Sequence, residues 1–202
     1  MKKMKKQILM IIKVMSPAEL TDVSDILEGA FADKFTDKTT LSAQEVKTLM
    51  KLLWLKESQV FGLQPYVLKD GDEVVAAFGI TGQTQKRCSV SFIAKVLAVL
   101  RQYGVRELFH FAKTGLETSR SPADDELYID FIAVKASRRD ENIGHRVMEA
   151  IDALKAREPG IRKVSLYVLK DNGPARHLYT KFGFQPLSKY EKSAYLFMMK
   201  TS

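Results

Sequence analysis

The chain has 202 residues, of which 46% are hydrophobic and 28% are charged. These values predict one globular domain over residues 1–202 and argue against an intrinsically disordered protein. The formal net charge is +8, but the lysines near the N-terminus supply much of it: Lys2, Lys3, Lys5, Lys6 and Lys13. The rest of the chain is only mildly basic, a charge balance that suits a phosphate-bearing cofactor or an acidic partner. No basic helix with base-reading spacing accompanies these lysines, so no nucleic-acid partner is expected.

The N-terminal segment is interpreted as a basic tail, residues 1–7, followed by a first strand over Ile8–Val14. Its apolar run is short, Lys13 interrupts it, and no cleavage pattern of small residues follows, which argues against a signal peptide. No stretch reaches the roughly 18 apolar residues that a membrane helix needs, so no membrane partner is expected. Cys88 is the only cysteine, which excludes an internal disulfide and a cysteine-based zinc site and fits a reducing cytoplasm. No metal is expected.

Two capping boxes mark the first predicted helices. The sequence SPAE, starting at Ser16, places serine at the N-cap, proline at the first helical position and glutamate three residues after the cap. This helix is expected to run to about Ala32. The sequence SAQE, starting at Ser42, repeats the box and predicts a second helix that ends near Lys56.

The middle of the chain contains a predicted hairpin and a helical segment. Residues 65–82 have the pattern of two strands joined by a turn at Asp70-Gly71. From Ser91 to Leu116 the apolar residues recur at helical spacing on both sides of Gly104. Residues 91–117 are therefore predicted to form a helical insertion.

The last part of the chain alternates strands and helices. The sequence ELYIDFIAV, starting at Glu126, ends in nearly continuous apolar residues, which indicates a strand buried on both faces. The elements predicted after it are a helix that buries Ile143, Val147, Ile151 and Leu154, a strand over Val164–Leu169, a short helix from about Pro174, and strands near Phe184–Leu187 and Ala194–Met199. This order predicts the fold class α/β (α+β), a mixed sheet with helices on both faces.

The turn RRDENIGH, starting at Arg138, leads from a strand into a helix. A helix N-terminus has unpaired backbone N–H groups and partial positive charge, so it stabilises a pyrophosphate. Arg138, Arg139 and His145 could add charge to such a site. An ordinary surface helix that begins among mixed charges is the alternative interpretation.

A second feature is the predicted strand pair that ends at Val134 and Leu169. If these strands splay apart, each exposes backbone amides and carbonyls, and a pantetheine arm could pair with them as a further strand does. Asn172, just after the second strand, could bond that arm or simply cap the helix that starts at Pro174. Together, the turn that starts at Arg138 and this strand pair would suit a long phosphorylated thioester.

Tyr179 and two carboxylates are the candidate catalytic groups. Tyr179 lies one turn after Ala175, at the edge of the packed helix face, where its hydroxyl could protonate a leaving thiolate. A packing tyrosine that reaches solvent is the alternative. Strand alternation puts Glu126, Tyr128, Asp130, Ile132 and Val134 on one face, barring a bulge. Glu126 is the first candidate base and Asp130 the second, and solvated carboxylates at a strand end are the alternative for each.

At these residues the chain resembles the GNAT superfamily of acyl-CoA N-acyltransferases, most specifically between Glu126 and Pro186. The family's later motif, Asn-x-x-Ala-x-x-Leu-Tyr-x-x-x-Gly-Phe, is matched by Asn172, Ala175, Leu178, Tyr179, Gly183 and Phe184. Its phosphate turn, Arg/Gln-x-x-Gly-x-Gly/Ala, is matched imperfectly over Arg139–Gly144, where Asn142 replaces the first glycine. The carboxylates of Asp140 and Glu141 could compete with a phosphate in this turn.

The resemblance implies a mostly antiparallel central sheet with a splayed strand pair, and acetyl-CoA as co-substrate. It also implies that the Val134 amide polarises the thioester carbonyl and that Tyr179 is the general acid. The coenzyme A contacts that it implies are Ile132, Ala133, Val134, Arg139, Asp140, Glu141, Asn142, Ile143, Gly144, His145, Asn172, Ala175 and Tyr179.

The predicted function is an N-acetyltransferase that moves an acetyl group from acetyl-CoA directly to a primary amine of a small molecule, peptide or protein. A catalytically silent acyl-CoA-binding or regulatory protein on the same fold is the alternative. The insertion over residues 91–117 would wall the acceptor pocket, form a homodimer contact or extend the core, and core extension is the default. His110 and His177 are weaker candidates, and His177 is expected to face solvent.

Overall fold

The computed structural model describes residues 10–82 and 90–201. The predicted basic tail and Cys88 therefore lie outside the described residues. The strands are β1 (Met10–Val14), β2 (Leu63–Asp70), β3 (Glu73–Thr81), β4 (Glu126–Val134), β5 (Lys163–Leu169), β6 (Gln185–Pro186) and β7 (Tyr195–Thr201). The α-helices are α1 (Leu20–Thr36), α2 (Ala43–Leu49), α3 (Val90–Leu116), α4 (Ile143–Ala156) and α5 (Gly173–Lys181).

Short helical segments complete these elements. The 3₁₀ segments are η1 (Pro17–Glu19), η3 (Ser58–Phe61), η4 (Ala136–Arg138) and η5 (Ser188–Tyr190), and a π-helical segment, η2 (Met50–Leu55), continues α2. Both predicted capping boxes are present, at Ser16 and Ser42. The first helix runs past Ala32 to Thr36 because Phe35 is buried in its last turn, with its ring centroid 4.9 Å from that of Phe111.

The strands form one sheet of seven in the order β1-β2-β3-β4-β5-β7-β6. The pair β4–β5 is parallel and the other neighbouring pairs are antiparallel. The predicted hairpin is β2–β3, which turns through Gly71 with φ 59°. The mixed, mostly antiparallel sheet with helices on both faces confirms the predicted fold class.

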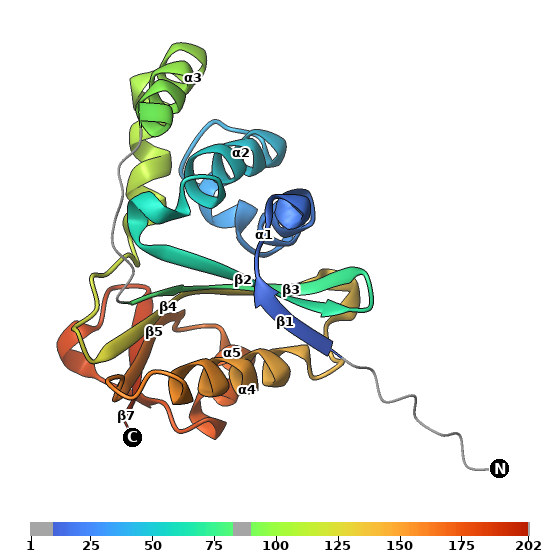
Figure 1. Cartoon of the computed structure of the whole chain (residues 1–202). Helices are drawn as coiled ribbons and strands as arrows, with labels where there is room; N and C mark the ends of the chain where they lie inside the picture. The colour runs from blue at the N-terminus through green and yellow to red at the C-terminus, as the bar shows by residue number, and fades with distance from the viewer. Residues whose placement is uncertain (1–9, 83–89, 202) are drawn as a thin grey trace.

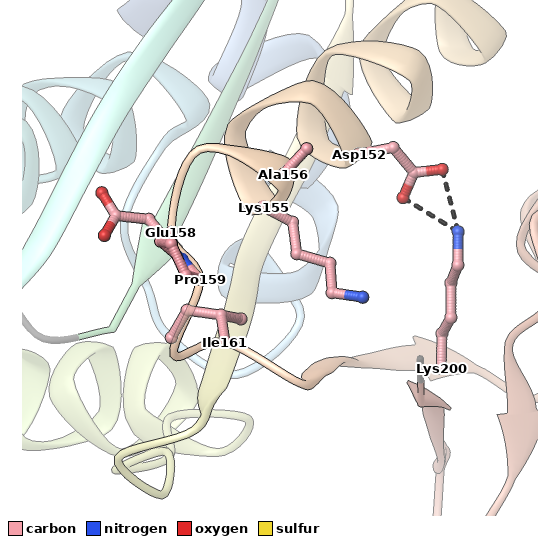
Figure 2. Close-up of a pocket in the computed structure, with 7 residues that line it drawn as sticks. All are labelled: Asp152, Lys155, Ala156, Glu158, Pro159, Ile161 and Lys200. Atoms are coloured by element: carbon pink, nitrogen blue, oxygen red, sulfur yellow. Dashed lines mark hydrogen bonds and ion pairs between the residues drawn. The ribbon is translucent and has the colours of Figure 1, made fainter.

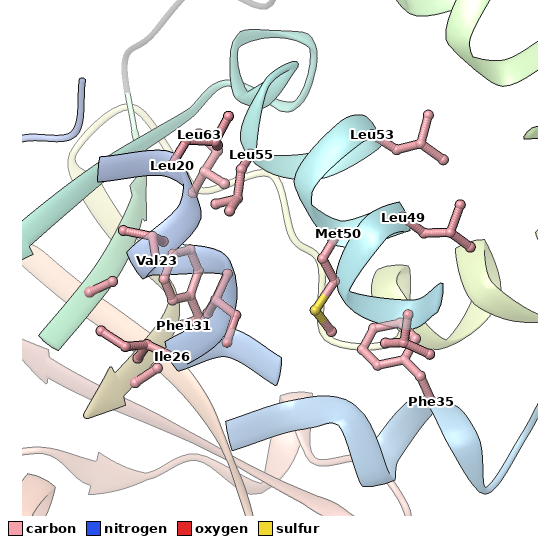
Figure 3. Packing of buried hydrophobic residues seen from close by; sticks show 14 of the residues in the cluster. Leu20, Val23, Ile26, Phe35, Leu49, Met50, Leu53, Leu55, Leu63 and Phe131 are labelled. Carbon is pink, nitrogen blue, oxygen red and sulfur yellow. The ribbon is translucent and has the colours of Figure 1, made fainter. Parts of the chain in front are cut away.

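Two apolar layers cover the sheet. Helices α1, α2 and α3 lie on one side of it and α4 and α5 on the other (Figure 1). The first layer buries Val23, Leu49 and Met50 completely and reaches the sheet through Phe131 of β4 (Figure 3). In the second layer, Val147 of α4 is fully buried within the cluster that covers the opposite face.

The predicted insertion forms α3, which is two helices joined at a kink. Gly104 has φ 82° and ψ 167°, a backbone conformation that a residue with a side chain rarely adopts. Val99 and Phe111, one on each side of the kink, are buried in the first layer. The kink therefore lets one amphipathic segment pack at two different angles.

Candidate functional site

The parallel strands β4 and β5 part before they end. Their pairing stops at Ile129↔Leu166, although β4 continues to Val134 and β5 to Leu169. On their outer sides both strands stay paired to their last residues, β4 with β3 and β5 with β7. The inner edges beyond the last pair therefore have no strand partner, and an extended ligand that carries amides can pair with them.

The turn that follows β4 adopts left-handed backbone angles at two positions. Asp140 has φ 69° and Asn142 has φ 58°, and they are the residues other than glycine with positive φ in the described part of the chain. Asparagine and aspartate tolerate this conformation better than most residues, which explains how Asn142 replaces a glycine here. Asn142 is the N-cap of α4, and its side chain makes no capping hydrogen bond. The first N–H groups of α4 thus suit an anion.

Arg138 neutralises much of the acidic charge next to this turn. Its guanidinium lies 2.7 Å from Asp70, 2.5 Å from Glu73 and 2.9 Å from Glu141. The hydrogen bonds that the guanidinium donates to these carboxylates raise the pKa of Arg138 above its usual range. Glu141 is therefore paired within the protein, while Arg139 is exposed on the turn.

Helix α5 packs closely against the start of α4. A Cβ added at Gly144 would lie 3.1 Å from Cδ2 of Leu178, so only a residue without a side chain fits there without displacement. The ring of His145 lies 4.8 Å from that of Phe182, at the end of α5. These contacts bring the turn after β4 and the helix that carries Tyr179 together.

Tyr179 lies on α5 against the second apolar layer, and its ring centroid is 6.0 Å from that of Phe184. Burial raises the pKa of Tyr179 to about 12, so the hydroxyl keeps its proton at neutral pH. Ile132 and Val134 of β4 pack against the same layer. Asn172 caps α5, because its side-chain oxygen accepts a hydrogen bond of 3.1 Å from the amide of Ala175.

Asp130 is the extra residue of a β-bulge. Phe131 pairs with Gly79 and Ile129 pairs with Ile80, so no residue of β3 stands opposite Asp130. The bulge reverses the alternation of faces, and the expectation that Ile132 and Val134 share a face with Glu126 is wrong. Ile132 and Val134 pack in the second layer, as Ile129 does, whereas Phe131 packs in the first.

Glu126 lies at the opposite end of β4 and is 1% exposed. Its carboxylate is 2.9 Å from the guanidinium of Arg120, and it accepts hydrogen bonds from the hydroxyl of Ser165 and, at 3.2 Å, from the amide of Ala123. The carboxylate of Glu126 is thus buried and hydrogen-bonded within the protein, as expected for a residue that stabilises the fold. The sequence reasoning missed Arg120, which lies in the loop before β4, with its guanidinium 4.7 Å from the ring centroid of Tyr190.

A cavity of about 320 Å³ lies in the first layer, between α1, η2, η3, α3 and β4. Aromatic side chains dominate its wall, among them Phe35, Trp54 and Phe111. Asp130, the first β4 residue beyond the last pair with β5, also lines it. The strand gap and the cavity therefore meet at Asp130.

The comparisons with known proteins decide the family. The family model described as "Acetyltransferase (GNAT) family" matches residues 27–184. The chain belongs to this family. The match confirms the predicted acyltransferase class. No curated protein matches the sequence.

Solved structures share the GNAT fold at low sequence identity. The PaiA N-acetyltransferase of Thermoplasma acidophilum in complex with coenzyme A has a TM-score of 0.61 and 11% identity, with 96% of this chain and 99% of that chain covered. The aminoglycoside acetyltransferase AAC(6')-Ib in complex with coenzyme A has a TM-score of 0.60 and 13% identity, with 95% and 94% covered. A putative acetyltransferase of Salmonella typhimurium, yncA, with acetyl-CoA, has a TM-score of 0.54 and 12% identity, with 95% and 93% covered.

Of the GNAT motif residues, Ala175, Leu178 and Tyr179 pack against the same layer as Ile132 and Val134, whereas Gly183 lies near Lys200, at the other end of β5. A hollow of about 390 Å³ is lined by Lys155, Glu158 and an ion pair of 2.8 Å between Lys200 and Asp152 (Figure 2). It lies at the end where β5 begins, because Lys200 pairs with Val164. It is therefore remote from the end where β4 and β5 part.

The two histidines considered in the sequence lie outside the gap. His177 is exposed on α5, as expected, and His110 is half-buried on α3. Within residues 10–82 and 90–201 no cluster of histidine, cysteine or acidic residues is arranged to hold a metal ion. Among the same residues no helix combines the length and apolar character needed to cross a membrane.

Proposed function

We propose that the protein is an N-acetyltransferase that moves an acetyl group from acetyl-CoA directly to a primary amine of a small molecule. The observation that carries the proposal is the end of β4–β5 pairing at Ile129↔Leu166, while both strands continue. Tyr179, the tyrosine of the GNAT motif on α5, packs against the same apolar layer as Ile132 and Val134 of the unpaired part of β4. Coenzyme A and acetyl-CoA in the complexes of structurally similar proteins support the choice of co-substrate.

The residues present fit coenzyme A in two respects. The open edge formed by Ile132, Ala133 and Val134 can bond the amides of the pantetheine arm. The turn Arg139–His145 offers the N-terminus of α4, a left-handed backbone and two exposed basic side chains to the pyrophosphate. Glu141 competes little with the phosphates because Arg138 pairs with it at 2.9 Å.

The transfer needs one proton acceptor and one proton donor. The amine nitrogen bonds to the thioester carbonyl carbon, the carbon–sulfur bond breaks, and the products are an amide and the coenzyme A thiol. Asp130 lines the cavity and takes a proton from the amine, directly or through water. Tyr179, whose pKa burial raises to about 12, carries its proton at neutral pH and donates it to the leaving sulfur. The Val134 amide polarises the carbonyl.

The size of the cavity supports a small acceptor. Its volume of about 320 Å³ is near the lower end of the range of about 300–1,000 Å³ typical of small-molecule sites. Helix α3 forms part of the wall, so the insertion over residues 91–117 acts as an acceptor wall within a single domain. The lone cysteine of the chain fits a cytoplasmic enzyme.

Calorimetry with acetyl-CoA, followed by thiol release over a panel of amines, tests the proposal. The expected result is saturable binding and acceptor-dependent thiol release. Binding without thiol release on any amine would favour the silent acyl-CoA-binding alternative, which the exposed carboxylate of Asp140 in the phosphate turn supports. Absence of acetyl-CoA binding would contradict both.

A further inference from the structure

The cavity combines aromatic walls with two charged side chains. Aromatic rings from five elements line it, including Phe35 of α1, Trp54 of η2 and Phe111 of α3. Among its described lining residues, Lys34 and Asp130 are the charged ones. A ligand that fills this space must therefore bury an apolar body and can pair with one cation and one anion.

Lys34 is incompletely neutralised by the protein. Its Nζ lies 3.9 Å from the carboxylate of Glu117, and the same oxygen is closer to Lys38, at 3.2 Å. Lys192 donates to the backbone carbonyl of Glu117, which adds a third cation. The pKa of Lys34 is lowered to about 8, mainly by burial, with Lys38 and Lys192 adding to this effect and Glu117 opposing it. An anion beside Lys34 would therefore be stabilised.

The two charged side chains lie on different sides of the cavity, Asp130 on β4 and Lys34 close to β7, the outer neighbour of β5. Asp130 is the first residue of β4 after the last pair with β5. Lys34 has its Nζ 5.1 Å from the ring centroid of Tyr195, which pairs with Leu169 at the end of β5. A ligand in the cavity can thus present an ammonium group to Asp130 and a carboxylate to Lys34.

We propose that the acceptor is an apolar α-amino acid, with its amine at Asp130, its carboxylate at Lys34 and its side chain among the aromatic rings. This inference rests on the proposed N-acetyltransferase activity. The amine then lies where the cavity meets the strand gap, which is where the thioester is proposed to bind. The two opposite charges disfavour a polyamine, because Lys34 would repel its second cation.

Trp54 offers a readout of cavity binding that is independent of turnover. It is the only tryptophan of the chain, it lines the cavity, and its ring centroid is 5.0 Å from that of Phe131. Fluorescence titrations of the full chain with L-phenylalanine, phenethylamine and spermidine therefore report binding at this site. We expect L-phenylalanine to change the fluorescence at the lowest concentration, phenethylamine at a higher one, and spermidine not to change it.

The variant Lys34→Met removes the charge and keeps an unbranched apolar chain. We expect it to raise the half-saturating concentration of L-phenylalanine by about tenfold, since a charge-assisted hydrogen bond is lost, and to leave that of phenethylamine unchanged. Lys38→Met is the matched control, because Lys38 pairs with the same carboxylate of Glu117 but does not line the cavity. It should change the half-saturating concentration of L-phenylalanine much less than Lys34→Met does, and leave that of phenethylamine unchanged.

The results separate the inference from the proposed function. If phenethylamine binds as tightly as L-phenylalanine, or if both lysine variants behave alike, the amino-acid inference is wrong. If L-phenylalanine binds with the expected dependence on Lys34 but acetyl-CoA releases no thiol with any amine, the transferase proposal fails and the assignment of the cavity ligand stands. If thiol is released with spermidine alone, the transferase proposal stands and the inference is overturned.

Discussion

The hydroxyl of Thr81 on β3 donates a hydrogen bond to the carboxylate of Asp130 on β4. Thr81 is 4% exposed, so its position is set by the sheet around it. Asp130 has no residue opposite it on β3, because it is the extra residue of the bulge. The side chain of Thr81 thus orients the carboxylate that lines the cavity.

Replacing Thr81 by valine should weaken this orientation. Thr81→Val keeps the shape of the side chain but removes the donor, and a hydrogen bond to a charged group contributes about 1.5–3 kcal/mol. We expect kcat to fall by about tenfold or more, with unchanged affinity for acetyl-CoA in calorimetry. Thr81→Ser retains the hydroxyl and should restore most of the activity. Equal losses in both variants would contradict a positioning role.

The two carboxylates of β4 should respond differently to amide substitution. Asp130→Asn removes the proposed proton acceptor and should lower turnover by about 10²–10⁴-fold, with little change in urea unfolding. Glu126→Gln breaks a buried pair with Arg120 and should lower the free energy of unfolding by about 3 kcal/mol. Its folded fraction should retain turnover. The reverse pattern, with turnover lost in Glu126→Gln alone, would make Glu126 the base.

Tyr179→Phe should lower thiol release by about 10²-fold or more if its hydroxyl protonates the leaving sulfur. Affinity for acetyl-CoA should stay nearly the same, because the ring and its contact with Phe184 remain. Tyr103→Phe is the control, since Tyr103 packs in the first layer on α3. Unchanged turnover in Tyr179→Phe would remove Tyr179 from the mechanism.

The same tyrosine gives a pH dependence with a definite sign. Burial raises the pKa of Tyr179 to about 12, whereas an unfolded tyrosine titrates near its ordinary value of about 10. The unfolded chain therefore releases this proton first, and its contribution to stability is present below pH 10 and lost as the pH rises to about 12. The ultraviolet difference between wild type and Tyr179→Phe should show a phenol that ionises above pH 11.

Local sequence signals predicted most of the elements because each has a short-range cause. Serine and glutamate three residues apart set the starts of the first two helices, and Gly71 allows the positive φ of the hairpin turn. The GNAT motif could be found from spacing alone, since it lies within the short segment from the N-cap of α5 to the residues just after its end. In contrast, α1 extends past Ala32 because of a long-range contact between Phe35 and Phe111, which no local signal carries.

The site was less predictable because tertiary contacts determine it. Regular strand alternation assigned the β4 residues up to Ile129 to the correct faces of the sheet. It assigned those after Asp130 to the wrong faces, because the bulge depends on the pairing with β3. The role of Glu126 depends on Arg120, a loop residue whose place is fixed by packing near Tyr190. The cavity draws residues from five elements, so its shape could not follow from any one segment.

Asn142 should tolerate glycine but not a β-branched residue. Its φ of 58° costs valine about 1–3 kcal/mol, whereas glycine adopts it freely. We expect Asn142→Val to weaken acetyl-CoA binding in calorimetry and Asn142→Gly to preserve it. Ser137→Val is a control in the neighbouring 3₁₀ segment η4. If Asn142→Val binds as the wild type does, the backbone of this turn does not contribute to cofactor affinity.

Gly79 should be needed for the bulge that displays Asp130. A Cβ at Gly79 would lie 2.7 Å from Cδ1 of Leu63 and would also collide with the ring of Phe131. Gly79→Ala should therefore cost about 1–3 kcal/mol of unfolding free energy and should lower turnover as Phe131 and the adjacent Asp130 shift. Chemical denaturation and thiol release measure the two effects.

Gly29→Ala is the matched control for this substitution. Gly29 lies within α1, and a Cβ there would meet no atom within 4 Å. Alanine should stabilise the helix by about 0.5–1 kcal/mol and leave turnover unchanged. If Gly79→Ala unfolded at the same denaturant concentration as Gly29→Ala, the tight contact of Gly79 with Phe131 would not hold the bulge. The hydrogen bond from Thr81, and not the bulge contact, would then position Asp130 at the cavity.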